Sequence, residues 1–245
     1  CFAFFHPRMP EEPLIFVWVA LVNELSDNVG TLLDVNQSVS IEETDNTAIF
    51  YSISSTQSGL AGVSLGDFLI KRVTDELRRE LPQLNRFSTL SPIPGFSPWL
   101  TAQTENSPEA NLFTEEQRNK IAEHSVLSIE ALLEGQDWYH DEAIAPVMKE
   151  ILAPLAARYI TEEKRSGHRA LDSVAHFHLS NGARVERINW LGDVSERGKK
   201  QSHTLMVNYL YDLEDIEGNH EQYIETGTIA TSKEVAAMLQ AKKEE

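Results

Sequence analysis

The sequence predicts an α+β fold, or mixed α/β fold, in which a central mixed sheet is interrupted by a helical insertion. Runs rich in β-branched and aromatic residues occur towards both ends of the chain, and such runs are typical of strands. One of these runs is followed by a glycine-rich loop and an amphipathic helix. The stretch from Leu100 to about Ser166 has helical character and no strand signal. The resulting order is strands, helix, strand, helical insertion, short helix and strands, which indicates this fold class.

The chain begins with two predicted strands, residues 2–5 and 14–22, which a proline-rich turn over residues 7–13 joins. The second strand is favoured over a helix because it contains Ile, Phe, Val, Trp and Val in succession. Asp27 is the candidate N-cap of a short helix at residues 29–33.

The next part of the chain contains the clearest strand–loop–helix pattern. Residues 36–46 are polar and are interpreted as a loop, and residues 47–54 form a strong strand. The glycine-rich loop 55–66 leads into an amphipathic helix at 67–81, which Pro82 ends. A short strand is predicted next, at residues 86–90.

The insertion and the C-terminal part follow. Thr114 and Gln117 have the spacing of a capping box, and a long apolar helix is predicted at residues 143–159 with interruptions at Pro146 and Pro154. Beyond the insertion we predict strands at residues 183–190 and 204–213 and a terminal helix at 235–239.

The composition argues against several classes of protein. The 245 residues are 41% hydrophobic and 24% charged, which is ordinary for a globular chain that buries a core. A single cysteine cannot form an internal disulfide, and a reducing, intracellular compartment is expected. The net charge of −17, without any block of basic residues, argues against nucleic-acid binding. Since no apolar run approaches twenty residues, we expect no membrane span.

The strand at 47–54, its loop and its helix have the arrangement of an anion-binding cradle. Free backbone N–H groups and the positive end of the helix dipole point to the same place. Gly59, Gly62 and Gly66 would let the backbone approach a pyrophosphate closely, and Lys71 and Arg72 would add positive charge. The spacing is neither that of a Walker loop nor Gly-x-Gly-x-x-Gly, so a helix start without a ligand is the alternative.

Two histidines, His176 and His178, lie in a segment with two possible structures. A hairpin turning at residues 181–182 would place both rings on one face of a strand, as a metal-binding pair requires. A helix capped by Asp172 or Ser173 and ended by Asn-Gly would separate them, leaving one buried and one exposed. Because the sequence offers no third ligand at suitable spacing, we expect no metal site.

Ser91 begins the run Ser-Pro-Ile-Pro-Gly-Phe. The two prolines stiffen this segment and fix the direction of the serine, which makes Ser91 a candidate hydrogen-bond donor or nucleophile. The alternative is a serine that merely starts a proline-rich turn. The sequence has no Gly-x-Ser-x-Gly elbow, which argues against a hydrolase of the α/β type.

Taken together, these segments resemble the malonyl-CoA decarboxylase family in its C-terminal catalytic domain. The likeness runs over nearly the whole chain in order, and its most specific part is Leu-Ser-Pro-Ile-Pro-Gly-Phe at residues 90–96. The other segments that carry it are residues 48–54, 59–66, 68–73, 177–183, 187–190 and 193–195.

The resemblance implies a GNAT-like acyl-CoA-binding fold, with one catalytic domain over residues 1–245 and the helical insertion at about 100–166. In GNAT proteins a loop before a helix binds the CoA pyrophosphate. The aligned stretch here, residues 59–64, keeps Gly62 and departs from the motif at both ends. A second GNAT motif carries a tyrosine that is often a general acid, and residues 174–183 follow its spacing with His178 in the tyrosine position. This likeness favours the helix over the hairpin and His178 over His176.

The resemblance also implies decarboxylation of malonyl-CoA to acetyl-CoA and carbon dioxide, without a metal or organic cofactor. Such a reaction leaves an enolate, which needs hydrogen-bond donors at the thioester oxygen and a proton for the α carbon. The family's catalytic pair falls on Ser91 and His178, with His178 as proton donor and Ser91 as its partner and proton acceptor; a transient acyl-serine is the alternative. The implied substrate-binding residues are Ala61, Gly62, Val63, Ser64, Leu65, Gly66, Asp67, Asn189 and Tyr211, although Ser64 stands where some relatives have Glu.

Two rival functions belong to other classes: a GNAT-type N-acyltransferase and a non-catalytic CoA-binding fragment. Family members carry an all-helical oligomerisation domain before this one, which this chain lacks, so the full-length protein is expected to be a homo-oligomer.

The expected partners are malonyl-CoA and acetyl-CoA, and neither nucleic acid nor membrane. We expect a cytoplasmic location, or a mitochondrial one if a longer precursor exists, and the sequence shows no peroxisomal tail. Lys71, Arg72, Lys199 and Lys200 are the cations expected to offset the net charge around CoA.

Overall fold

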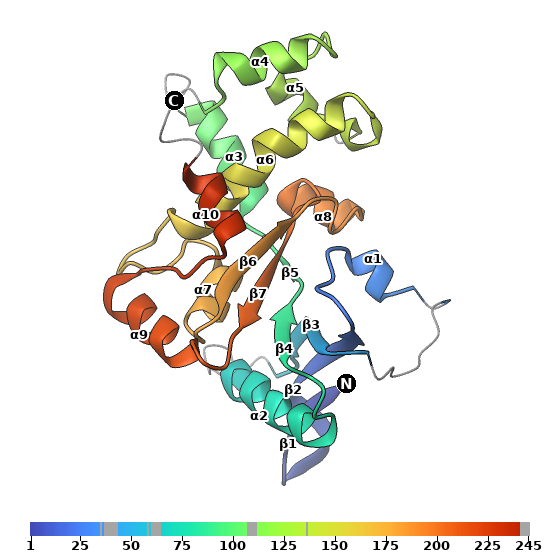
Figure 1. The fold of residues 1–245 in the computed structure, drawn as a ribbon, viewed down its shortest axis with the longest axis vertical. Helices are drawn as coiled ribbons and strands as arrows, with labels where there is room; N and C mark the ends of the chain where they lie inside the picture. Colours follow the sequence, from blue (N-terminus) through green and yellow to red (C-terminus); the bar gives the residue numbers. More distant parts are fainter. Residues whose placement is uncertain are drawn as a thin grey trace.

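A mixed sheet of seven strands runs through the described part of the chain, which comprises residues 1–34, 36, 44–57, 59, 65–106, 112–135 and 137–240 of the computed structural model. In Figure 1 the strands occupy the lower and middle parts of the molecule, and helices drawn green to yellow form its upper end. The strands are β1 (Phe2–His6), β2 (Met9–Val22), β3 (Thr47–Ser55), β4 (Arg86–Thr89), β5 (Ser91–Pro92), β6 (Arg184–Asn189) and β7 (Met206–Tyr211).

The helices are distributed unevenly along the chain. A short helix lies between β2 and β3, and one long helix follows β3. A group of helices lies between β5 and β6, and the remaining helices are interspersed with the last two strands or follow them. They are α1 (Val29–Leu32), α2 (Leu65–Glu80), α3 (Phe96–Asn106), α4 (Glu115–Ala122), α5 (Ile129–Glu134), the 3₁₀ turn η3 (Trp138–His140), α6 (Ile144–Thr161), α7 (Ser173–Leu179), α8 (Glu196–Ser202), α9 (Ile216–Thr226) and α10 (Lys233–Gln240).

The sheet mixes parallel and antiparallel pairs, as predicted. Its strand order is β1-β2-β3-β4-β7-β5, and β6 pairs with β7. β3 and β4 are parallel because α2 returns the chain between them, whereas the other pairs of described strands are antiparallel. The predicted mixed α/β fold is therefore confirmed.

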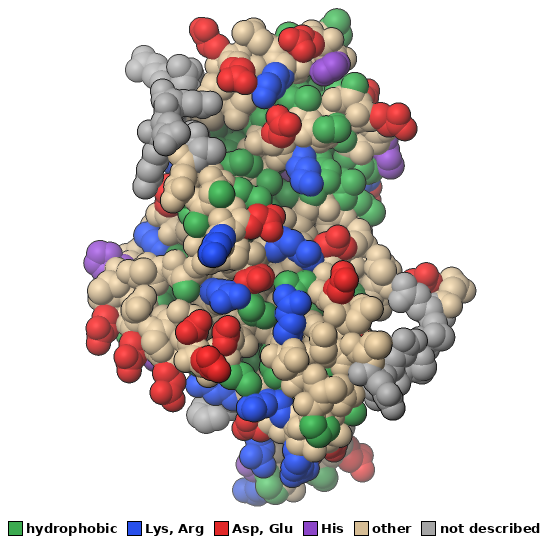
Figure 2. Space-filling model, viewed as in Figure 1, with side chains coloured by type: hydrophobic (Ala, Val, Ile, Leu, Met, Phe, Trp, Pro, Cys, Tyr) green, Lys and Arg blue, Asp and Glu red, His purple; other side chains and the backbone are tan. Residues whose placement is uncertain are grey.

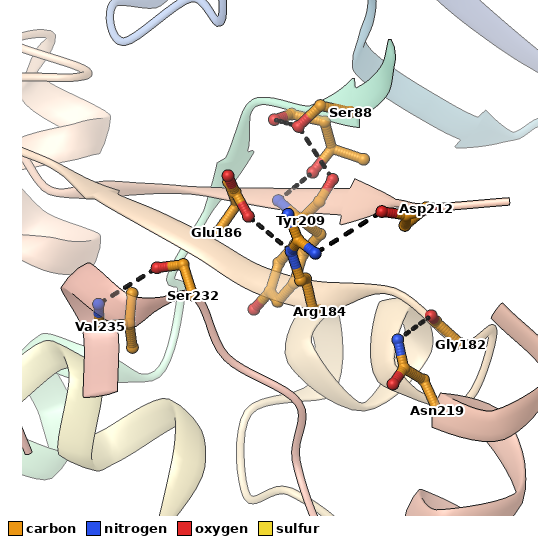
Figure 3. A network of polar contacts seen from close by, with 10 residues as sticks. Ser88, Gly182, Arg184, Glu186, Tyr209, Asp212, Asn219, Ser232 and Val235 are labelled. Carbon is orange, nitrogen blue, oxygen red and sulfur yellow. Dashed lines mark hydrogen bonds and ion pairs between the residues drawn. The ribbon is translucent and has the colours of Figure 1, made fainter. Parts of the chain in front are cut away.

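β4 and β5 lie end to end along one side of β7, and the ladder of backbone hydrogen bonds changes between them. Both strands keep a common register with β7. At the junction the Tyr209 amide donates to the Thr89 hydroxyl at 3.2 Å, and the Ser88 hydroxyl donates to the Tyr209 carbonyl at 3.0 Å (Figure 3). Side chains thus replace part of the backbone pairing at the point where Ser91 follows.

The helical stretch between β5 and β6 packs around α6. The described residues from 100 to 161 contain no strand, and beyond them Lys164 forms an isolated β-bridge with Ala170. Thr114 and Gln117 form the predicted capping box at the start of α4. α6 contacts α3, α4, α10 and β6, so this stretch shares one hydrophobic core with the sheet.

Prolines have less effect on the secondary structure than predicted. α6 is one continuous helix, because Pro146 lies in its first turn and the residues on either side of Pro154 are held by burial in the core. The predicted turn over residues 7–13 is also largely wrong. β2 already begins at Met9, and Pro13 pairs with Phe5 at an irregularity in the register, where a strand tolerates a proline.

Helix boundaries differ from the prediction in two places. α1 is capped by Asn28, whose Oδ1 accepts from the Thr31 amide, rather than by Asp27. α2 begins at Leu65 instead of residue 67, and its residues Leu69, Val73 and Leu77 are buried as its periodicity indicates. The side chain of Phe68 lies outside the description, as do most of the residues predicted as the loop 36–46.

The sequence patterns did not indicate α8 and α9. α8 has the sequence Glu-Arg-Gly-Lys-Lys-Gln-Ser, and α9 buries Tyr223 as its one fully buried residue, so neither shows a strong apolar period. The other predicted strands and the terminal helix are present with shifts of one or two residues at their ends. Within the described residues, no helix has the length and apolar character needed to cross a membrane.

Candidate active site

Ser91 and His178 meet at the junction between β4 and β5. Ser91 is the first residue of β5 and His178 lies in the last turn of α7, 87 residues later, and Ser91 Oγ is 3.2 Å from His178 Nε2. Both side chains are buried, with 5% and 3% of their surface exposed. The two residues named as a catalytic pair from the sequence are therefore in hydrogen-bond contact.

The segment that carries His178 is a helix, and the hairpin interpretation is wrong. Asp172 Oδ1 accepts from the amides of Val174 and Ala175 at 2.9 Å, which caps the start of α7. The helix ends before Gly182, whose φ of +81° is a conformation that glycine adopts readily.

The two histidines of α7 point to different partners. His176 Nδ1 lies 2.8 Å from the Tyr223 hydroxyl of α9. Its side chain is half-buried, which corrects the expectation that the second histidine would be exposed. The described residues contain no cluster of three or more His, Cys, Asp or Glu side chains placed to hold a metal ion.

The serine side of the pair is held by groups of the sheet. Ser91 Oγ donates to Thr89 Oγ1 at 2.9 Å, and Asn208 Nδ2 donates to the Thr89 carbonyl at 2.7 Å. Sequence reasoning did not identify Thr89. Residues i and i+2 of a strand share a face, so its position two residues before Ser91 was the available signal.

The histidine side is held by two tyrosines of β7. His178 Nδ1 is 2.7 Å from the Tyr211 hydroxyl, and the imidazole stacks on the Tyr209 ring with centroids 4.6 Å apart and planes inclined by 26°. Burial lowers the pKa of His178 to about 3, so the ring is neutral at pH 7.

The hydrogen-bond network assigns a tautomer to His178. Because Ser91 donates its proton to Thr89, its oxygen accepts from Nε2–H, and Nδ1 then accepts from the Tyr211 hydroxyl. The imidazole therefore has a proton on the side of Ser91 and a second donor behind it. Such an arrangement can deliver a proton at Nε2 while Nδ1 takes one from Tyr211.

Asn189 supports the site without touching the pair. Its amide donates to Asn208 Oδ1 at 2.9 Å, and Asn208 in turn contacts Thr89. Arg187 donates to Asn189 Oδ1 at 2.7 Å and to the Leu25 carbonyl at 2.8 Å, which ties this network to the segment after β2.

The predicted substrate-binding loop is described only in part. Ala61, Gly62, Val63 and Ser64 lie outside the described residues, whereas Leu65, Gly66 and Asp67 form the first turn of α2. Their binding role stays a prediction.

The cations expected around CoA differ in their surroundings. Lys71 and Arg72 are exposed on α2. Lys199 is in an ion pair with Glu196 at 2.8 Å, and its Nζ lies 4.9 Å from the centre of the Tyr139 ring. Lys199 is therefore less available to offset the negative charge of a ligand than the sequence indicated.

A pocket of about 310 Å³ reaches the tyrosine behind His178. It lies between α2 and the segment that joins β7 to α9, and Tyr211 forms part of its wall. Its charged lining residues are Lys71, Asp75, Glu214 and Glu217, of which three are acidic, and apolar side chains line the rest in part. The pocket offers solvent a route towards Tyr211.

Comparison with known proteins gives a consistent result. The family model described as the malonyl-CoA decarboxylase C-terminal domain matches residues 1–245. Mitochondrial malonyl-CoA decarboxylase of Anser anser anser is 42% identical over 98% of this chain and 49% of its own length. The same enzyme of Rattus norvegicus is 40% identical over 98% of this chain and 50% of its own length. The chain thus spans about half the length of these curated relatives.

Solved structures agree in fold as well as in sequence. The crystal structure of malonyl-CoA decarboxylase from Agrobacterium vitis superposes with a TM-score of 0.86 at 45% identity, covering 97% of this chain and 56% of the other. For the enzyme from Rhodopseudomonas palustris the TM-score is 0.85 at 46% identity, with 96% of this chain and 52% of the other covered.

Proposed function

The chain belongs to the malonyl-CoA decarboxylase family, whose C-terminal domain it matches, and from this membership we propose that it decarboxylates malonyl-CoA to acetyl-CoA and carbon dioxide. The observation that carries the proposal is the contact between Ser91 and a neutral, buried His178. The name of the family gives the substrate, malonyl-CoA, and the bond that is broken, and so defines what this pair has to do.

The proposed reaction consumes one proton in each turnover. Cleavage of the bond between the carboxylate carbon and the α carbon releases carbon dioxide and leaves the electron pair on the enolate of acetyl-CoA. The α carbon must then receive a proton, while hydrogen-bond donors stabilise the enolate oxygen. Since the thioester carbonyl delocalises the electron pair, the proposed reaction needs no metal or organic cofactor.

We assign the delivery of this proton to His178. Its Nε2–H donates to the α carbon as Nδ1 takes the proton of Tyr211, and Tyr211 is reprotonated from the solvent pocket that it lines. Ser91, which faces Nε2 and is held by Thr89, orients the substrate and the imidazole. The buried position of both side chains excludes water, so their electrostatic effects are stronger than they would be in solution.

We further propose that the loop before α2 binds the CoA pyrophosphate. α2 is sixteen residues long, and its N-terminus, which comes directly after that loop in the sequence, has the positive end of the helix dipole. The positions assigned to this role are Ala61 to Asp67, with Lys71 and Arg72 one turn into the helix.

The proposal is tested by measuring carbon dioxide and acetyl-CoA released from malonyl-CoA, with no amine present. We expect release by the chain, and a loss of about two to four decades in kcat for His178→Gln and for Ser91→Ala, the usual scale for general acid–base help. His176→Gln and Ser97→Ala are the matched controls, because they change a second histidine of α7 and a second buried serine, in α3. Both controls should retain activity.

Several outcomes would contradict the proposal. Full activity of His178→Gln or Ser91→Ala would remove that residue from the mechanism, and acetyl transfer only when an amine is added would indicate an N-acyltransferase. A stable acyl group on Ser91, detected by mass spectrometry during turnover, would show the covalent route instead of the hydrogen-bonding one.

A second experiment tests whether the decarboxylase activity depends on the oligomeric state of the protein. We propose that the protein forms homo-oligomers, as the resemblance to a family with an all-helical oligomerisation domain implies. Size-exclusion chromatography with the decarboxylase assay on the same fractions shows whether activity follows an assembled species. Folded protein that is inactive in every fraction would favour the non-catalytic fragment.

A further inference from the structure

We infer that Asp172 is a positioning residue, whose single carboxylate fixes the loop that carries Ser91 relative to the helix that carries His178. The inference rests on the proposed function in so far as this pair performs the reaction. Asp172 lies between α6 and α7, is 2% exposed, and was identified from the sequence only as a candidate helix cap.

One oxygen of Asp172 holds the helix. Oδ1 accepts hydrogen bonds from the amides of Val174 and Ala175, both at 2.9 Å. His178 follows six residues after Asp172 on this short helix. Because the helix is short, with a rise of only about 1.5 Å per residue, a shift of its first residue also displaces the imidazole of His178.

The other oxygen holds the serine loop. Oδ2 accepts from the Gly95 amide at 3.3 Å, and Gly95 is four residues after Ser91. Pro92 and Pro94 stiffen the intervening segment, and the Phe96 amide closes it by donating to the Ile93 carbonyl at 3.1 Å. A bond at Gly95 therefore restrains the position of Ser91.

The helical stretch between β5 and β6 contributes a third segment to this contact. The Tyr159 hydroxyl of α6 faces the Asp172 carboxylate, and burial together with that carboxylate raises the pKa of Tyr159 above its usual value. The serine loop packs closely against α6 at this point. A Cβ added to Gly95 would lie only 2.1 Å from the Tyr159 hydroxyl oxygen. Asp172 thus connects three segments that are distant from one another in sequence.

A helix cap alone does not require this arrangement. Asp141 accepts the same pair of bonds in the turn before α6, through Oδ1 from the amides of Ala143 and Ile144 at 2.9 and 3.1 Å, yet Asp141 is exposed. Asp172 is buried although burial raises the pKa of its carboxyl group, and its second oxygen is aimed at another segment. The contrast between the two residues points to a role beyond capping.

Asp172→Asn separates the two roles. Asparagine caps helices about as well as aspartate, so the oxygen facing α7 is kept. The amide nitrogen that replaces Oδ2 is a donor and cannot accept from the Gly95 amide. Asp141→Asn is the matched control, since it makes the same chemical change at a carboxylate that accepts from two backbone amides in the turn before α6.

We expect Asp172→Asn to lower kcat for malonyl-CoA by about 10- to 100-fold, the scale of a misplaced reactive group, with KM changed less than about threefold. Asp141→Asn should leave both constants unchanged. In a His178→Gln background Asp172→Asn should cause no further loss, because it acts through the pair. An unchanged kcat, or an equal loss with and without His178, would overturn the inference.

A spectroscopic measurement separates this inference from the proposed function. In the ¹⁵N-labelled chain we expect the imidazole nitrogen resonances of His178, assigned with His178→Gln, to shift in Asp172→Asn and not in Asp141→Asn. This shift is expected even if the chain releases no carbon dioxide, an outcome that contradicts the proposed function alone. Unshifted resonances in Asp172→Asn would overturn the positioning role.

Discussion

His178 illustrates how burial sets the chemistry of a single residue. In water its imidazole would be partly charged near neutral pH, but burial against Tyr209 and Ser91 lowers its pKa to about 3. A neutral ring can accept a proton at one nitrogen while it donates from the other. Its proposed role therefore depends on the donor behind it, which is Tyr211.

Tyr211→Phe tests this dependence. Removing the hydroxyl leaves Nδ1 without the donor at 2.7 Å, so proton delivery by Nε2 should become less favourable. We expect kcat for malonyl-CoA to fall by about 10- to 100-fold with little change in KM, towards the lower end of general acid–base effects. Steady-state kinetics of the purified variant provides the measurement.

Tyr223→Phe serves as the control for that variant. It removes a hydroxyl that contacts His176, the other histidine of α7, at 2.8 Å. Activity near that of the unmodified chain is expected for Tyr223→Phe. If Tyr211→Phe keeps full activity, the relay through Nδ1 is wrong, whereas His178 could still donate from Nε2.

At the residue scale, the sequence identified the two groups that meet but not the groups around them. Ser91 and His178 were placed through a family motif, and the structure brings them to 3.2 Å. Thr89, Tyr209 and Asp172 belong to ordinary strand and cap patterns, so nothing local marked them as neighbours of the site. Their roles depend on contacts between segments far apart in the chain.

Among the elements, α7 is the one whose ends matter most for the site. Its start is held by Asp172, and its end is set by Gly182, which has a positive φ and lies against α9. A Cβ added to Gly182 would be 2.1 Å from the Ile216 carbonyl oxygen. Any larger residue must therefore move α9 or the end of α7.

Gly182→Ala should destabilise the protein. The left-handed backbone and the contact with Ile216 both disfavour alanine, so we expect the free energy of unfolding to fall by about 2 kcal/mol or more. Denaturation in urea, followed by circular dichroism, gives this quantity.

Gly218→Ala is the matched control in the same region. Gly218 lies within α9, and a Cβ there meets nothing within 4 Å. Alanine should raise the free energy of unfolding by about 0.5–1 kcal/mol, since glycine is a poor helix former. Equal effects of the two substitutions would show that the close approach at Gly182 is unimportant.

Element boundaries show where pattern reasoning succeeds. The amphipathic α2, the capping box of α4 and the strands β3, β6 and β7 were predicted because each has a strong local signal. α8 and α9 were missed because packing against other elements, rather than their own apolar period, stabilises them. The prolines of α6 do not interrupt it as predicted, because burial of the helix outweighs one lost hydrogen bond.

The whole molecule carries a net charge of −17, and that charge is not evenly distributed. Acidic side chains gather at the lower left edge of Figure 2, where Figure 1 places α9. The exposed residues there include Glu214, Asp215, Glu217, Glu221 and Glu225. A multiply charged anion such as malonyl-CoA is therefore repelled at long range and must be held by local contacts.

Ionic strength should reveal this repulsion. Between about 0.01 and 0.15 M salt the screening length falls from ~30 Å to ~8 Å, which removes most of the long-range repulsion between the protein and malonyl-CoA. We expect kcat/KM for malonyl-CoA to rise by about two- to threefold over this range, with kcat unchanged, because only the approach of the substrate is affected.

A malonyl thioester of pantetheine, which lacks the nucleotide phosphates, is the control substrate for that experiment. Its smaller charge should give a weaker salt dependence. If kcat/KM for malonyl-CoA falls with added salt instead, attraction by local cations such as Lys71 and Arg72 outweighs the net charge.

The sequence by itself determined the family, the mixed α/β class and the two residues expected to react, because these depend on local motifs and on the order of elements. Only the tertiary structure decided that Ser91 and His178 share a hydrogen bond at a break in the sheet, with Tyr211 behind the ring. It also decided that the Asp172 carboxylate joins helix and loop. The physical reason is that burial and contacts between distant segments set the spacing and the charge state of these groups, and neither is encoded in any short stretch of the chain.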